Sequence, residues 1–328
     1  MAFNNTIALA SKYVPILDEV YKVASLTAVL DGPAELAREG ANANELVIPK
    51  LNMSGMADYS RNSGYVDGAV TLTHQTVVCD YDRGRMFQVD TLDNSESADI
   101  AFGRLAGEFI RVKAVPEIDA YRFAKYANAA ANKVAAALDT GAKVVTALRA
   151  AANSLNEDEV DPASRVLFIT PTALGLVEDL DTTASRTVLN HFGTIVPVPQ
   201  TRFLSNIELT SNGYRKAVAA YVKTTDVALV TGKTYYTVSN DVYTAVASPD
   251  VADIATYYEQ TVAPGFNLNF LAVHKPALIQ FSKHIAPKII SPELNQNADA
   301  WKFGYRNVGI AQVYENKLDG VYAHLALT

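Results

Sequence analysis

Residues 45–90 have the sequence ELVIPKLNMSGMADYSRNSGYVDGAVTLTHQTVVCDYDRGRMFQVD. The stretch opens with an apolar run at 46–51 and returns through apolar positions at 70–78 and 86–89, while its polar middle contains three glycines. Apolar runs on either side of a glycine-punctuated polar centre predict two long antiparallel strands with a loose tip, which is an extended β-hairpin. A strand of about 15 residues would reach roughly 50 Å at ~3.4 Å per residue.

A hairpin of this kind needs a surface to lie on, because an isolated two-stranded hairpin is only marginally stable in water. Its polar middle contains Tyr59, Arg61 and Tyr65, and tyrosine and arginine are enriched at protein–protein interfaces. Either the rest of the same domain covers the hairpin or a neighbouring subunit does, and the pattern leaves both alternatives open. The candidate subunit-interface residues are Met53, Tyr59, Arg61, Tyr65, Arg83 and Arg85.

The composition narrows the class of protein. The 328 residues are 49% hydrophobic and 19% charged, which is typical of a folded globular protein. The formal net charge is −7, and this disfavours sequence-specific DNA or RNA recognition, because proteins that grip phosphates are usually basic. Cys79 is the only cysteine, so an intrachain disulfide is excluded and a reducing compartment is favoured. The N-terminal sequence has no basic region before an apolar core, and no apolar window approaches ~18 residues, so we expect a soluble protein made in a cytoplasm.

The N-terminal segment has a helical pattern. Ile16, Val20 and Val23 recur at helical spacing, and the Asp-Gly-Pro sequence at 31–33 ends the helix that is predicted over residues 11–30. This helix either packs on the core of its own chain or forms an arm that lies on a neighbouring subunit. Periodicity favours neither alternative.

Two further helical regions follow, at residues 95–138 and 142–155. Within the first, the Val115-Pro116 pair predicts a boundary or a kink, because the residue before a proline is pushed out of the helical conformation. Thr140-Gly141 separates the two regions. The alanine-rich end of the first region is predicted to be helical.

A mixed α/β pattern occupies the next part of the chain. A buried strand at 165–170 precedes a helix that begins at Pro171, and a second strand at 193–199 contains prolines that place it near a sheet edge. Residues 206–265 are rich in Thr, Tyr, Val and Asn and predict a β-rich insertion. This insertion is either an exposed decoration or a continuation of the same domain.

The C-terminal part alternates apolar and polar residues. Strands are predicted at 301–313 and 321–327, and they are expected to form a hairpin through the turn at 316–320.

Residues that could carry chemistry do not form a recognisable site. The five histidines include no i, i+4 pair of the kind found on a zinc-protease helix, and Cys79 has no CxxC partner. The string at 231–234, TGKT, resembles the end of a phosphate-binding loop, but Val227 stands where that loop requires glycine. Asp80, Asp82 and Asp90 lack the closing glutamate of a calcium loop. We therefore expect no catalytic residue, no cofactor and no metal site.

Four stretches, in this order along the chain, resemble a known family. They are residues 48–65, 81–90, 115–122 and 316–324, and they are similar to the extended loop, its return, the start of the spine helix and the closing strands of tailed-bacteriophage major capsid proteins with the Hong Kong 97-type fold. Encapsulin compartments also use this fold. The resemblance covers roughly residues 12–204 and 266–328, and its weight lies in the order of the stretches, because none is a specific motif alone.

The resemblance implies an α+β fold with four parts. An N-terminal arm would span residues 1–44 and an extended β-hairpin loop residues 45–92. A peripheral domain with the spine helix and a C-terminal sheet would span 93–163 and 266–328, and an axial domain would span 164–265, with the β-rich insertion at about 206–265.

The resemblance also implies a structural, non-enzymatic role. The subunits would assemble as pentamers and hexamers into an icosahedral head that encloses a DNA genome, with a scaffolding protein, a portal, a candidate cement protein and non-specific contact with packaged double-stranded DNA, but no membrane. The protein would assemble in the host bacterial cytoplasm and reside in the virion. An encapsulin-like shell around a protein cargo is the alternative, and an enzyme built on the α/β region is a third hypothesis for which the sequence offers no residues. Some relatives crosslink a lysine of the extended loop to a neighbour, but Lys50 stands at the base of this loop, so we do not extend that chemistry to this chain.

Overall fold

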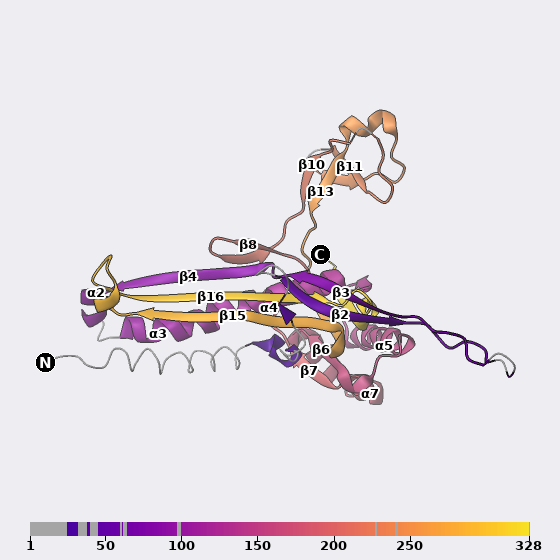
Figure 1. Cartoon of the computed structure of the whole chain (residues 1–328), viewed down its shortest axis with the longest axis horizontal. Coiled ribbons are helices and arrows are strands. Elements are labelled where there is room, and N and C mark those ends of the chain that lie inside the picture. The colour runs from indigo at the N-terminus through magenta and orange to yellow at the C-terminus, as the bar shows by residue number, and fades with distance from the viewer. Residues whose placement is uncertain are drawn as a thin grey trace. The chain divides into compact units, whose positions relative to one another are not determined.

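The computed structural model describes residues 25–31, 38–39, 45–59, 61, 64–96, 100–226, 228–239 and 242–327. The described chain is α+β (Figure 1). It divides into two compact units. The first unit comprises the described residues within 30–106 and 279–310, and the second those within 18–29, 107–278 and 311–328. No helix among the described residues is both long and apolar enough to cross a membrane.

The first unit contains the predicted hairpin. Strand β2 (Glu45–Met53) pairs with β3 (Val70–Val78) in antiparallel register, and the short β1 (Arg38–Glu39) pairs with the other edge of β2. Ser54 closes the ladder, because the Ala69 amide donates to its Oγ at 2.7 Å and its own amide donates to the Ala69 carbonyl at 3.0 Å. The antiparallel hairpin is confirmed, with strands of nine residues instead of about 15.

The predicted return strand at 81–90 is not part of this hairpin. Strand β4 (Tyr81–Asp90) pairs instead with β16 (Ala300–Val313), in a three-stranded sheet of order β15-β16-β4 with β15 (Leu278–Ile290). The physical reason is that β16 offers β4 a continuous antiparallel partner over ten residue pairs, whereas β2 is already paired along its full length.

A long helical region leads from the first unit into the second. It consists of α2 (Thr91–Glu96), α3 (Ile100–Phe109), a π-helical turn (Ile110–Ala114) and α4 (Val115–Ala129). Pro116 does not end the helix, because the wide π-helical turn before it accommodates a residue that has no N–H and whose ring would otherwise meet the preceding turn. The boundary predicted at Val115-Pro116 is therefore the junction of two helix types.

The second unit is built on a five-stranded sheet of order β5-β17-β14-β6-β7. Helices α5 (Gly141–Glu157), α6 (Pro171–Glu178) and α7 (Thr183–Leu189) contribute the apolar core on one face, and Phe123 of α4 packs on Phe168 with ring centroids 5.0 Å apart. The sheet is therefore covered on both faces. Its strands are β5 (Asn132–Ala135), β17 (Val321–Leu325), β14 (Leu268–His274), β6 (Arg165–Ile169) and β7 (Thr194–Pro197).

Two predictions in this unit are wrong. Residues 132–135, within the region predicted to be helical, form the edge strand β5, because pairing with β17 overrides the local pattern. The predicted C-terminal hairpin does not form, because β17 pairs with β14 and β5 while β16 belongs to the other sheet. The edge position predicted for the proline-containing strand β7 is confirmed.

The region at 206–265 is β-rich, as predicted. Strands β8 (Ile207–Thr210) and β9 (Gly213–Lys216) form a two-stranded ribbon. A four-stranded sheet of order β10-β13-β11-β12 has its own small core of Tyr235, Ile254 and Tyr257. Its strands are β10 (Ala220–Lys223), β11 (Tyr235–Ser239), β12 (Val242–Ala245) and β13 (Tyr258–Val262).

Short 3-10 helices connect these elements. Of the helix predicted at 11–30, residues 11–24 lie outside the described part of the chain, and Leu26–Leu30 form a 3-10 helix. The others are Pro162–Ser164, Gln200–Arg202, Val251–Thr256, Lys275–Ala277, Pro292–Leu294 and Leu318–Gly320. The boundaries of the two compact units differ from those of the expected arm, hairpin, peripheral and axial parts. The four-part division stays a prediction.

Candidate subunit-interface surfaces

The tip of the hairpin exposes large apolar side chains. Met56 is fully exposed and Tyr65 is 90% exposed, and the rings of Tyr59 and Tyr65 meet edge to face with centroids 4.9 Å apart. Each member of the set is more than half exposed, and we call the set the hairpin surface: Met53, Met56, Tyr59, Tyr65, Val66, Val70 and Leu72. Large apolar side chains exposed together on one element are a candidate interaction site.

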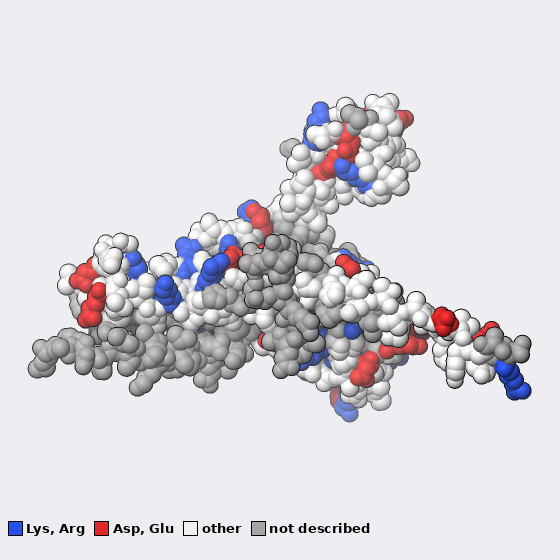
Figure 2. All heavy atoms as spheres, viewed as in Figure 1, with Lys and Arg blue, Asp and Glu red and all other residues white. Residues whose placement is uncertain are grey.

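The hairpin carries few charged groups, and uncharged atoms dominate its described part (Figure 2). Arg61 is exposed in the turn between the two tyrosines. An apolar surface with a single arginine beside it has the composition of an interface core, where charged residues are depleted and aromatic residues, Met and Arg are enriched.

Arg83 and Arg85, the other two predicted interface residues, lie on β4 and not on the hairpin. Both point to the same face of the strand as Tyr81, since residues two apart share a face; Arg83 is half-buried and Arg85 is exposed. On the other face, Arg306 of β16 donates from Nε to Asp82 Oδ1 at 2.8 Å. The structure therefore brings Met53, Tyr59, Arg61 and Tyr65 together on one hairpin and places the two arginines on a separate sheet.

Four members of the hairpin surface were missed from the sequence: Met56, Val66, Val70 and Leu72. A signal for two of them was present, because Val70 and Leu72 alternate with threonines in β3 and so share one face of the strand.

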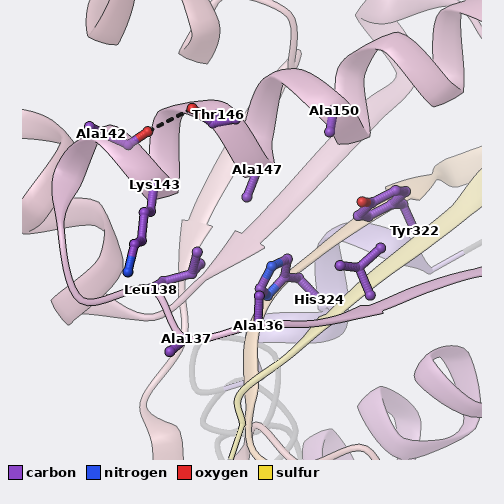
Figure 3. Close-up of a pocket in the computed structure, with 11 residues that line it drawn as sticks. Ala136, Ala137, Leu138, Ala142, Lys143, Thr146, Ala147, Ala150, Tyr322 and His324 are labelled. Carbon is purple, nitrogen blue, oxygen red and sulfur yellow. Dashed lines mark hydrogen bonds between the residues drawn. The ribbon is translucent and has the colours of Figure 1, made fainter.

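A groove lies in the second unit, where α5 faces β5 and β17 (Figure 3). This groove has a volume of about 600 Å³ and is lined mainly by small apolar side chains, with Ala147 and Ala150 of α5 facing Tyr322 and His324 of β17. Lys143 Nζ lies 2.7 Å from Asp139 Oδ1. Thr146 donates to the Ala142 carbonyl at 2.9 Å within the helix.

His324, which lines this groove, contacts two side chains of β14. Its Nδ1 lies 3.1 Å from the Asn269 amide nitrogen, and its ring stacks on Phe270 with centroids 4.9 Å apart. Burial lowers the pKa of His324 and raises the pKa of Tyr322, so both side chains are neutral at pH 7. The groove therefore offers mainly small apolar side chains together with the neutral rings of Tyr322 and His324.

The TGKT string at 231–234 has a structural role that the sequence did not suggest. Lys233 Nζ lies 2.8 Å from both Asp226 Oδ2 and Glu259 Oε2, and the Tyr235 hydroxyl also donates to Asp226 at 2.8 Å. The hydrogen bonds that Lys233 donates to these carboxylates raise the pKa of Lys233, and the ammonium in turn lowers the pKa of Asp226 and Glu259. Among the described residues, no cluster of three His, Cys, Asp or Glu side chains could hold a metal ion.

The fold has counterparts among solved structures. The asymmetric unit of the bacteriophage PhiM1 mature capsid aligns with a TM-score of 0.52 at 12% sequence identity, over 87% of this chain and 82% of that one. The chain has the fold of a phage capsid subunit. A structure from Mycobacterium phage Che8 aligns with a TM-score of 0.50 at 13% identity, over 86% of this chain and 85% of that one. No protein-family model and no curated protein matches the sequence.

Proposed function

We propose that this chain is the major capsid protein of a tailed bacteriophage, a structural subunit that assembles as pentamers and hexamers into an icosahedral head around the DNA genome. The observation that carries the proposal is the hairpin surface, seven large apolar side chains that remain more than half exposed on a chain with a phage capsid fold. A second copy of the chain would bury these side chains.

The physical argument is one of burial. Moving a large apolar side chain from water into an interface contributes about 1.5–3 kcal/mol, so covering several of them provides a substantial driving force for association. The hairpin of one copy would meet a different surface of the next, and such a head-to-tail contact generates closed rings when the rotation between copies closes. Pentamers and hexamers are rings of this type.

Six residues are the proposed contact set: Met53, Tyr59, Arg61, Tyr65, Arg83 and Arg85. The first four share one hairpin, where they would bury together against one neighbour. The two arginines on β4 would contribute hydrogen bonds to a second part of the interface.

The remaining partners follow from the same proposal. The subunits would assemble in the host bacterial cytoplasm with a scaffolding protein and a portal, accept a cement protein on the outer surface, and end in the virion. Contact with packaged double-stranded DNA would be non-specific, in keeping with a net charge of −7, and no membrane is involved. Residues 1–44 would serve as the arm, 45–92 as the extended loop, and the remaining chain as the peripheral and axial domains with the insertion at 206–265.

Electron microscopy of the purified full chain, with nucleic acid and protein content assayed in the same fraction, tests the proposal. We expect closed icosahedral shells that hold DNA or that form with DNA-packaging partners. Shells filled with a second protein would instead identify an encapsulin-like compartment. A discrete small oligomer that persists in the presence of the scaffolding protein would refute the shell function altogether.

A further inference from the structure

The carboxylate of Asp119 lies buried at the centre of a hydrogen-bond cluster in the second unit. Asp119 stands in the first turns of α4, is 0% exposed, and accepts bonds from three residues of the N-terminal segment. The hydroxyls of Ser25 and Thr27 donate to Oδ1 at 2.9 and 2.7 Å. The amides of Leu26 and Thr27 donate to Oδ2 and Oδ1 at 3.1 and 3.3 Å.

A cation from a third part of the chain completes the cluster. Arg202, at the end of the Gln200–Arg202 turn, donates from Nη1 to Asp119 Oδ2 at 3.0 Å and is 19% exposed. Arg122, one helical turn after Asp119, is buried and donates to Thr27 Oγ1 at 2.8 Å. The turn that holds Arg202 is tied to the next ribbon, because the Tyr214 hydroxyl donates to the Thr201 carbonyl at 3.1 Å.

We propose that Asp119 is a releasable clasp, through which the Gln200–Arg202 turn controls whether the N-terminal segment up to Thr27 stays bound to helix α4. The proposal concerns a conformational device and does not depend on the function proposed above. Its basis is the convergence of four donors from residues 25–27 and one arginine on a single carboxylate.

The device follows from the cost of leaving buried polar groups without partners. Three of the four donors are backbone amides or the hydroxyl of Leu26 and Thr27, and each of them loses its Asp119 acceptor if the carboxylate turns away. A buried carboxylate in turn is stable only while a cation compensates it. A change at Arg202 therefore reaches residues 25–27 although Arg202 donates to none of them in the cluster.

The consequence is a link between two distant parts of the sequence. The Gln200–Arg202 turn lies just before β8 and the β-rich region, and residues 1–24 are joined covalently to the clasped segment. A partner that drew Arg202 away would loosen the attachment of the N-terminal segment. Conversely, a partner that pulled on that segment would free Arg202.

Hydrogen exchange of the full chain, read at the Leu26 and Thr27 amides, tests the clasp. In Asp119→Asn we expect both amides to exchange at least roughly tenfold faster, while the amides of the core helix α5 keep their protection. In Arg202→Met we expect roughly fivefold faster exchange at the same two amides. Asp139→Asn and Lys143→Met remove one member each of an exposed ion pair on the surface and serve as matched controls with no effect at these amides.

Wild-type exchange at Leu26 and Thr27 in Arg202→Met would overturn the coupling, and wild-type exchange in Asp119→Asn would overturn the clasp itself. If Asp119→Asn does not fold, Ser25→Ala replaces it. This variant removes the Ser25 hydroxyl donor and leaves the bonds of Arg122 and Arg202 in the cluster in place, and it must accelerate exchange at Leu26 for the proposal to stand.

Discussion

Serine substitutions at Met56 and Tyr65 separate the stability of the subunit from the stability of its assembly. Both side chains project almost entirely into solvent, so the folded subunit gains little from their packing. Surface changes of this kind alter the free energy of unfolding by no more than about 0.5 kcal/mol. We therefore expect the Met56→Ser/Tyr65→Ser variant to unfold within a few degrees of the wild-type chain.

Assembly should respond very differently. Burial of each side chain against a neighbour contributes about 1.5–3 kcal/mol, so the double variant loses about 3–6 kcal/mol per contact. Since about 1.4 kcal/mol corresponds to a factor of ten, each contact weakens roughly 100- to 10,000-fold. The concentration at which shells or capsomers form should rise accordingly.

Light scattering and size-exclusion chromatography over a dilution series measure this threshold, and thermal unfolding of the same samples measures the subunit. A matched control is Val218→Ser/Val251→Ser, which removes two exposed apolar side chains outside the hairpin. An unchanged assembly threshold in the hairpin variant would refute the interface argument. A fall of more than a few degrees in its unfolding temperature would show instead that the hairpin tip packs on its own subunit.

Three further predictions concern the second unit. Gly141→Ala should lower the free energy of unfolding by at least about 2 kcal/mol in denaturant unfolding, because the added Cβ would lie 2.1 Å from the Leu176 carbonyl oxygen. The control Gly175→Ala, which has open space around the added Cβ, should leave the stability unchanged or raise it by about 0.5–1 kcal/mol. Lys233→Met should lower the unfolding temperature at pH 7, and its difference from wild type should shrink as the pH falls below about 4, because carboxylates with a lowered folded pKa lose their stabilising ionisation there. His324 has a lowered folded pKa, so protonation favours the unfolded chain and stability should fall between pH 7 and 5; a calorimetric pH series in which His324→Gln leaves this slope unchanged would contradict the assignment.

The local sequence pattern was enough to predict the elements whose structure depends on residues close together in the chain. The alternation of apolar residues on either side of a glycine-rich centre was enough for the β2–β3 hairpin, and Thr140-Gly141 marked the start of α5. Pro197 and Pro199 correctly indicated an edge strand, because a proline cannot donate to a neighbouring strand.

The same pattern could not predict which strands pair with each other. A strand with period-two alternation does not state which strand it pairs with, and so 81–90 was assigned to the hairpin although β16 is its partner. Residues 132–135 lie in an alanine-rich part of the chain for which a helix was predicted, and pairing with β17 makes them the strand β5. Asp119 appeared as an ordinary helical residue, because its partners Ser25 and Thr27 lie more than 90 positions away in the chain.

The two edge strands of the five-stranded sheet in the second unit, β5 and β7, differ in sequence. Strand β7 ends in Pro197 and is followed by Pro199, neither of which has an N–H to donate to another strand, whereas β5 contains no proline and pairs with β17 alone among the described strands. Addition of a further strand is thus disfavoured at the β7 edge relative to the β5 edge. If copies of the chain assemble as proposed, a strand from another copy could extend this sheet at the β5 edge more readily than at the β7 edge, which would give the subunit a direction along which sheets can join.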